Sequence, residues 1–120
     1  NKVLNLIKKY NISLICLAGY MKIISKSFIN AYRKKIINVH PSLLPKYKGL
    51  NTYEKIILNK EKKTGCTVHF VNEKLDSGKL IVQKSFFIKK EDKVDILKKK
   101  TQKLEHKAFS EAIIKIYRYN

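Results

Sequence analysis

Two short apolar runs, separated by a helical pattern, constrain the fold of this chain most strongly. Residues 14–18 are continuously apolar, residues 36–39 are apolar apart from Asn38, and each run is too short for a buried helix. Such runs are typical of strands that are covered on both faces of a parallel sheet. Between them, residues 25–32 show helical spacing that begins at a serine suited to cap a helix. We therefore expect residues 13–39 to form a parallel, right-handed βαβ unit.

The rest of the N-terminal half combines helical and irregular segments. Residues 2–11 have the spacing of an amphipathic helix. Residues 40–50 contain two prolines and a glycine, which excludes a regular element there. Asn51 and Glu54 have the spacing of a capping box and predict a short helix after this segment.

The C-terminal half predicts two strands and a long helix. Residues 64–71 and 80–88 have strand character, and residues 73–78 between them form a turn. Apolar residues at intervals of three and four predict a long helix that starts near Asp92. The fold class is therefore α/β: a Rossmann-like open sheet with a parallel βαβ unit, additional strands and a long C-terminal helix. At 120 residues the chain is expected to form one domain, residues 1–120, or part of one.

The charge of the chain is strongly unbalanced. Lysine and arginine total 27 against nine acidic residues, which gives a formal net charge of +18. Only Arg33 and Arg118 are arginines, whereas a surface built to recognise phosphates or bases favours the bidentate guanidinium group. We interpret the charge as a compositional bias towards lysine, with a basic nucleic-acid-binding module as the non-enzymatic alternative.

Cysteine spacing and hydropathy favour a soluble, cytoplasmic protein. Cys16 and Cys66 form neither a C-x-x-C pair nor a metal-ligand spacing with histidine, so we expect two reduced thiols and no metal site. No apolar run reaches the length of a membrane span, and residues 1–18 lack the regions of a signal peptide.

Polar and glycine-containing segments follow the predicted strands. Residues 19–22, residues 38–40 and residues 75–76 all lie at strand ends or in turns between strands. Ligands of open α/β sheets bind beyond the carboxyl ends of the strands. We therefore expect these segments to meet at one edge of the sheet.

The chemistry of these segments suits attack by an external amine on a carbonyl group. Asn38 and His40 are two apart, so their side chains leave the same face of a strand and can donate to one oxygen. A carboxylate such as Asp76 would keep the imidazole protonated. Neither cysteine has a base beside it in the sequence, so a covalent intermediate is not expected. The alternative is that all three are turn and capping residues; His69 and His106 are interpreted as structural.

Three segments resemble the folate-dependent formyltransferases, in particular those that act in purine synthesis. Residues 38–49, Asn-Val-His-Pro-Ser-Leu-Leu-Pro-Lys-Tyr-Lys-Gly, are similar to the signature of that family. Residues 65–71, Gly-Cys-Thr-Val-His-Phe-Val, followed by Leu-Asp-Ser-Gly at residues 75–78, resemble its second signature. Residues 17–24 resemble its folate-pocket segment, and the similarity runs from residue 14 to about residue 108.

The resemblance implies a reaction and a role for each site residue. The formyl group of 10-formyltetrahydrofolate would pass to the amine of glycinamide ribonucleotide, on the pathway to IMP, without a metal ion. Asn38 and His40 would bind the formyl oxygen, with His40 as proton donor, and Asp76 would raise the pKa of His40 and order water. The pterin would be walled by Met21, Lys22, Ile23 and Ile24 and by Asn72, Glu73, Lys74, Leu75 and Asp76. The nucleotide would contact Gln102, Lys103, Leu104 and Glu105.

The resemblance has departures, and it leaves related activities open. Lys22 stands where the family usually has arginine, and Lys103 with Leu104 interrupts a more polar family run. The family begins with a strand and a glycine-rich phosphate turn that residues 1–12 do not resemble, so the chain is expected to be the catalytic portion of a longer enzyme. Methionyl-tRNA formyltransferase and formyltetrahydrofolate hydrolase are the alternative activities. Their motifs usually depart from the Pro-Ser-Leu-Leu-Pro sequence at residues 41–45.

Overall fold

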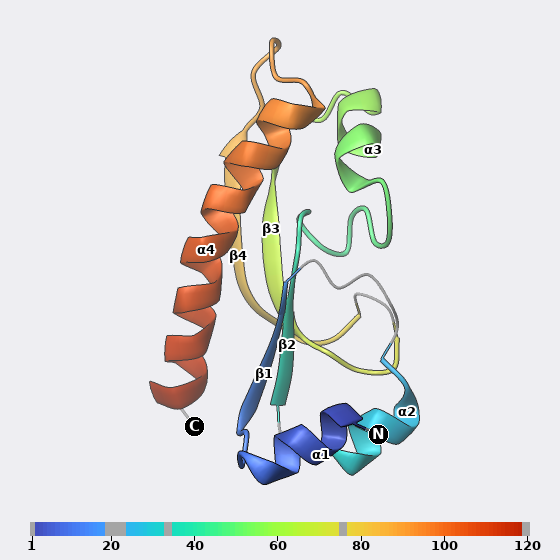
Figure 1. Ribbon diagram of the computed structural model, residues 1–120. Helices are drawn as coiled ribbons and strands as arrows, with labels where there is room; N and C mark the ends of the chain where they lie inside the picture. Colours follow the sequence, from blue (N-terminus) through green and yellow to red (C-terminus); the bar gives the residue numbers. More distant parts are fainter. Residues whose placement is uncertain (1, 19–23, 33–34, 75–76, 119–120) are drawn as a thin grey trace.

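A four-stranded mixed sheet with a long helix along one face forms the body of the molecule (Figure 1). The computed structural model describes residues 2–18, 24–32, 35–74 and 77–118. In spatial order the strands are β1 (Leu14–Ala18), β2 (Lys35–His40), β3 (Lys63–Phe70) and β4 (Leu80–Phe87). The helices are α1 (Lys2–Lys9), α2 (Lys26–Ala31), α3 (Thr52–Leu58) and α4 (Val94–Arg118). The β1–β2 pair is parallel, and the β2–β3 and β3–β4 pairs are antiparallel.

The predicted βαβ unit is confirmed. Strands β1 and β2 are parallel, and α2 connects them after Ser25, whose hydroxyl accepts a hydrogen bond of 3.2 Å from the Phe28 N–H. The expectation that β1 is covered on both faces is wrong for the described residues. Cys16, at its centre, is exposed, because α4 packs against β3 and β4 and does not extend over the middle of β1.

The apolar core lies between the sheet and α4. Ile37 and Val39 of β2 and Cys66 and Val68 of β3 are buried on the face that α4 covers. From α4, Ala108 and Ala112 contribute to the same cluster, with their side chains completely buried. Small side chains at these positions let the helix approach the strands closely, as close packing of the interior requires.

The C-terminal end of α4 returns to the beginning of β1. The Tyr117 hydroxyl lies 2.8 Å from the Ser13 hydroxyl, so a hydrogen bond joins residues that are 104 positions apart in the sequence. At its other end, α4 follows Asp92, whose carboxylate accepts from the Lys89 N–H at 2.9 Å and pairs with the Lys100 ammonium at 2.9 Å. The long helix is thus fastened by polar contacts near both ends.

The segment after β2 is irregular, as predicted, but the capping box is wrong. Asn51 has φ 57° and ψ 37°, a left-handed conformation, and its side chain makes no capping hydrogen bond. The Thr52 hydroxyl instead donates to the Gly49 carbonyl at 3.2 Å. Because the chain enters α3 through a left-handed residue, the Asn51 side chain is turned away from the N–H groups of the first turn.

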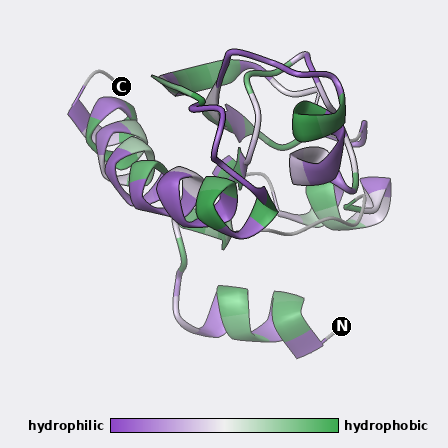
Figure 2. Cartoon of the chain, turned by 90° about the horizontal axis from the view of Figure 1, so that it is seen from above, coloured by the Kyte–Doolittle hydropathy of each residue, from purple (hydrophilic) through white to green (hydrophobic). Residues whose placement is uncertain are grey.

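Helix α1 packs little against the other elements. In Figure 2 it lies apart from the rest of the cartoon, with apolar residues along one side. None of its residues is buried, and Val3 and Leu6 are each 54% exposed. No helix in the described part of the chain is long and apolar enough to cross a membrane.

Candidate active site

Asn38 and His40 lie at the carboxyl end of β2, on the face opposite α4. Asn38 is opposite Leu17 of β1 and His69 of β3, and His40 is opposite Thr67 of β3. Residues that face each other across paired strands point to the same side of the sheet. Asn38, His40, Thr67 and His69 therefore form one polar group, which we call the polar face. All four are buried, with exposed fractions of 5% or less.

The polar face is larger than the sequence indicated. We expected His69 to be structural, and we assigned no role to Thr67. The spacing of two between Thr67 and His69 repeats that of Asn38 and His40, a signal that residues 67 and 69 share a face. It could not show that the two pairs meet, since that depends on the β2–β3 register.

The imidazole of His40 is oriented by the backbone of the following loop. His40 Nε2 lies 2.7 Å from the Tyr47 carbonyl oxygen. A carbonyl can only accept, so Nε2 carries the proton and donates in this hydrogen bond. Tyr47 has φ 57°, a left-handed conformation that non-glycine residues rarely adopt. Strained backbone of this kind is often found at functional sites.

The loop that supplies this carbonyl is fixed to the polar face by side-chain hydrogen bonds. The Thr67 hydroxyl donates to the Ser42 carbonyl at 2.7 Å and accepts from the Leu44 N–H at 3.1 Å. Gln83 of β4 donates to the Leu44 carbonyl at 2.8 Å and contacts the Thr67 hydroxyl oxygen at 3.0 Å. Residues 41–47 are therefore held in one position although they form no regular element.

The turn between β3 and β4 starts and ends beside the polar face. The Phe70 N–H donates to the Lys79 carbonyl at 2.9 Å, and the Asn72 side chain accepts from the Lys74 N–H at 2.9 Å. Gly78 leaves no room for a side chain, since a Cβ there would lie 1.5 Å from the Phe70 carbonyl oxygen. The glycine of the second signature thus allows the chain to return close to β3.

The expected folate-pocket residues are described only in part. Met21, Lys22 and Ile23, and likewise Leu75 and Asp76, lie outside the described residues. Ile24 is half-buried before α2, Asn72 is half-buried, and Glu73 and Lys74 are exposed. The pairing of Asp76 with His40 therefore stays a prediction.

The four residues expected to contact the nucleotide diverge around α4. The Glu105 carboxylate lies near Tyr53 of α3 and Cys66 of β3, and burial raises its pKa. Burial also raises the pKa of Tyr53, and the charge of Glu105 adds to that rise. Lys103 and Leu104 lie on the side of α4 that faces β4. Gln102 is exposed. The structure thus places Lys103 and Leu104 away from Glu105.

Neither thiol is suited to act as a nucleophile. Burial is the largest cause that raises the pKa of Cys66, to about 12, and burial also raises the pKa of Cys16. A thiol with the pKa of Cys66 carries almost no thiolate at neutral pH. Direct transfer without a covalent intermediate stays a prediction. Among the described residues, no three histidine, cysteine or acidic side chains are grouped as metal ligands.

The sequence also matches the family model described as formyl transferase, over residues 1–113. The chain belongs to the formyl transferase family. The four residues of the polar face and the loop of residues 41–47 lie inside the matched range. The resemblance inferred from the sequence is thereby confirmed for almost the whole chain.

Within the formyl transferase family, the similar proteins are named for purine biosynthesis. The phosphoribosylglycinamide formyltransferase of Haemophilus influenzae is 44% identical over 98 residues, which are 82% of this chain and 46% of that protein. The trifunctional purine biosynthetic protein adenosine-3 of Drosophila melanogaster is 44% identical over 107 residues, 89% of this chain and 8% of that protein.

Solved structures of similar proteins confirm the fold. The crystal structure of phosphoribosylglycinamide formyltransferase from Anaplasma phagocytophilum matches with a TM-score of 0.92 and 34% identity, over 98% of this chain and 56% of that one. The enzyme from Bacillus halodurans matches with a TM-score of 0.89 and 36% identity, over 96% of this chain and 59% of that one. The chain therefore spans little more than half the length of these relatives.

Proposed function

We propose that this chain is the folate-binding and catalytic portion of an enzyme that transfers a formyl group from 10-formyltetrahydrofolate to the amine of glycinamide ribonucleotide. The observation that carries the proposal is the polar face, where Asn38 and His40 lie side by side at a strand end beneath a fixed loop. The names of the relatives support the choice of substrates. We place the reaction in the cytoplasm, with no step assigned to a metal ion.

The reaction needs donors for an oxyanion and a route for one proton. The substrate amine attacks the formyl carbon, and the carbonyl oxygen becomes an oxyanion. Donation from the Asn38 amide and the His40 imidazole would stabilise that oxyanion more than the starting carbonyl. The bond between the formyl carbon and N10 of the folate then breaks, while the proton lost by the amine passes to N10.

The contact with Tyr47 defines how His40 could donate. Nε2 already donates to the Tyr47 carbonyl, so a proton given to the oxyanion must come from Nδ1. Both ring nitrogens carry protons only in the imidazolium form. The negative charge proposed for Asp76 would raise the pKa of His40, so that the imidazolium form is present at neutral pH. The proposed role of His40 as proton donor therefore depends on Asp76.

We assign two parts of the folate to residues on and around the polar face. We assign Asn38 to the formyl group, and we assign the pterin to the segments with Met21, Lys22, Ile23 and Ile24 and with Asn72 to Asp76. We assign Glu105, which lies near Tyr53 of α3, to the nucleotide together with Gln102, whereas Lys103 and Leu104 lie on the side of α4 that faces β4. The excess of lysine is assigned no specific nucleic-acid partner.

The test is a formyl-transfer assay with the intact protein that contains this chain. Glycinamide ribonucleotide and initiator tRNA are offered in parallel with 10-formyltetrahydrofolate, and water alone serves as the third acceptor. We expect formylation of the ribonucleotide. Formylation of the tRNA instead would support the tRNA formyltransferase activity, and release of formate without an acceptor would support the hydrolase activity.

A further inference from the structure

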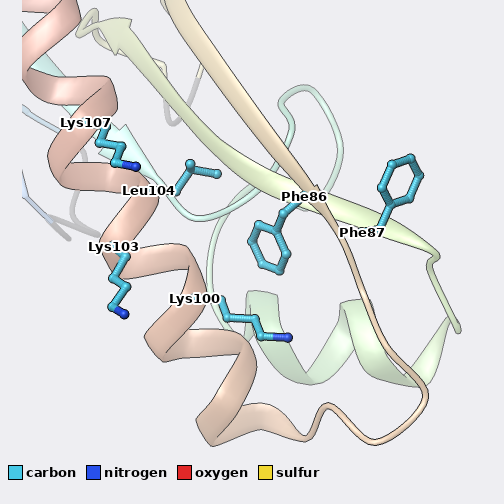
Figure 3. Close-up of a pocket in the computed structure, with 6 residues that line it drawn as sticks. All are labelled: Phe86, Phe87, Lys100, Lys103, Leu104 and Lys107. Atoms are coloured by element: carbon cyan, nitrogen blue, oxygen red, sulfur yellow. The ribbon is translucent and has the colours of Figure 1, made fainter.

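A pocket of about 400 Å³ lies between α4 and β4, on the face of the sheet opposite the candidate active site. Figure 3 shows the residues that line it, which are Phe86, Phe87, Lys100, Lys103, Leu104 and Lys107. Three are lysines of α4 at intervals of three and four, so they lie along one side of that helix. The other three are large apolar side chains. The pocket thus combines cations with an apolar wall.

Two lysines in or near the pocket are paired with a carboxylate. Lys84 of β4 lies 2.7 Å from the Glu111 carboxylate of α4, and Lys100 lies 2.9 Å from the Asp92 carboxylate. Within the described ranges, Lys103 and Lys107 have no carboxylate at ion-pair distance. Two ammonium groups of the same helix side therefore border the pocket with their charges uncompensated, and like charges at this spacing repel each other.

Of the two aromatic residues of the pocket, Phe86 is half-buried and Phe87 is exposed. Figure 3 shows Phe86 pointing into the space between β4 and α4, and Phe87 at the outer edge of the strand. Phe87 is 77% exposed. Elsewhere in the structure Lys35 lies 5.8 Å from the centre of the Phe70 ring, but no such cation–π contact is found at Phe86 or Phe87 in the described part of the chain. The lysines thus do not cover these rings.

We propose that this pocket binds a small organic anion that carries a flat aromatic ring. The ring would lie against Phe86 and Leu104, with Phe87 at the rim of the pocket, and the anionic group would pair with Lys107 and Lys103. A volume of about 400 Å³ lies in the range of small-molecule sites, which are mostly apolar with a few placed polar groups. The site is separate from the candidate active site, because the sheet lies between the pocket and the polar face.

The test is a titration of the intact protein with 1-naphthyl phosphate, followed by NMR and calorimetry at about 0.15 M salt. At that ionic strength, charges on the surface are largely screened beyond about 8 Å, so general attraction by the net charge contributes little. We expect saturable binding of one equivalent, with shifts of the amide signals of residues 86, 87 and 100–107. Inorganic phosphate and 1-naphthol, each half of the probe, should bind at least tenfold more weakly.

Matched variants locate the site. Lys107→Gln should weaken binding by about tenfold, because it removes a charged donor. Lys98→Gln makes the same change on the opposite side of α4 and should leave the affinity unchanged. Phe87→Ala should weaken binding of 1-naphthyl phosphate but leave the weak binding of inorganic phosphate unaltered. Phe87 and Lys107 are exposed, so neither change should unfold the protein, and circular dichroism verifies this.

Four results would overturn the proposal. The first is absence of saturable binding, and the second is equal weakening by Lys98→Gln and Lys107→Gln, which would mean attraction by the overall charge. The third is equal affinity for inorganic phosphate, which would mean a site for the anion alone. The fourth is displacement of the probe by glycinamide ribonucleotide, which would make the pocket part of the substrate site.

Discussion

The two faces of strands β2 and β3 are built from alternate residues of the same segments, yet they are held together in opposite ways. On the α4 side, Ile37 and Val68 pack in an apolar cluster without directional contacts. On the polar face, His40 and Thr67 are equally buried but are joined to the loop by hydrogen bonds. Burial of polar groups costs free energy unless partners are supplied. The apolar face therefore provides stability, and the polar face fixes positions.

The largest expected effect is on the polar face and concerns catalysis. His40→Ala should lower the rate of formyl transfer by about 100- to 1000-fold, as typical for the loss of one oxyanion donor. Folate binding, measured by calorimetry, should change by no more than a few-fold, because His40 is assigned to the formyl oxygen and not to the pterin. Near-normal turnover of the variant would remove His40 from the mechanism.

On the apolar face the main effect should appear in stability. Ile37→Ala removes a completely buried side chain beside Cys66 and Val68, and should lower the free energy of unfolding by roughly 2–4 kcal/mol. The rate of transfer at saturating substrates, measured below the unfolding temperature, should stay within about threefold. If the rate falls as far as in His40→Ala, the two faces are not functionally separate.

A smaller effect is expected where the loop is fastened to the polar face. Gln83→Leu removes the hydrogen bonds to Leu44 and Thr67, and leaves a carbonyl without that donor, at a cost of about 1–2 kcal/mol in urea unfolding. Because the same loop orients His40, the rate should fall as well. Ser85→Ala, on the same side of β4, is the control and should alter neither. A loss of stability with an unchanged rate would show that the loop position does not matter for His40.

The smallest effect concerns the beginning of the helix that covers the apolar face. The pKa of the Asp92 carboxyl is lowered, mainly by the hydrogen bond from the Lys89 N–H and to a smaller extent by the hydrogen bond from the Lys100 ammonium. A lowered folded-state pKa adds stability above the unfolded-state pKa of about 4, and this contribution is lost as the pH falls below it. Asp92→Asn should therefore reduce stability at pH 7 but not at pH 2, as measured by urea midpoints. Equal losses at both pH values would mean that the charge is irrelevant.

Local patterns predicted the first half of the fold well. The runs at residues 14–18 and 36–39 and the capping Ser25 depend on neighbouring residues, and the structure confirms the parallel unit they predicted. The capping box at Asn51 failed because a left-handed backbone conformation cannot be read from side-chain spacing. The exposure of β1 depends on where α4 packs, which the residues of β1 alone do not determine.

The sequence could place site residues on one face of the sheet only within a single strand. A period of two placed Asn38 and His40 on one face, but the neighbours Thr67 and His69 depend on the antiparallel register. A bulge between Val68 and His69 shifts the β3–β4 register, which no residue pattern announced. The contact of His40 with the Tyr47 carbonyl involves a backbone atom, so no side-chain motif could show it.

The hydrogen bond between Ser13 and Tyr117 has a consequence for the order in which the molecule assembles. Strands β3 and β4 are near neighbours in the chain, so they can pair after closing a short loop, whereas the Ser13–Tyr117 contact must close a loop of 104 positions. The entropy lost on closing a loop grows with its length, and distant contacts slow folding. We expect the last turn of α4 to dock on β1 late. Loss of the hydrogen bond between Ser13 and Tyr117 would then speed unfolding and leave the folding rate almost unchanged.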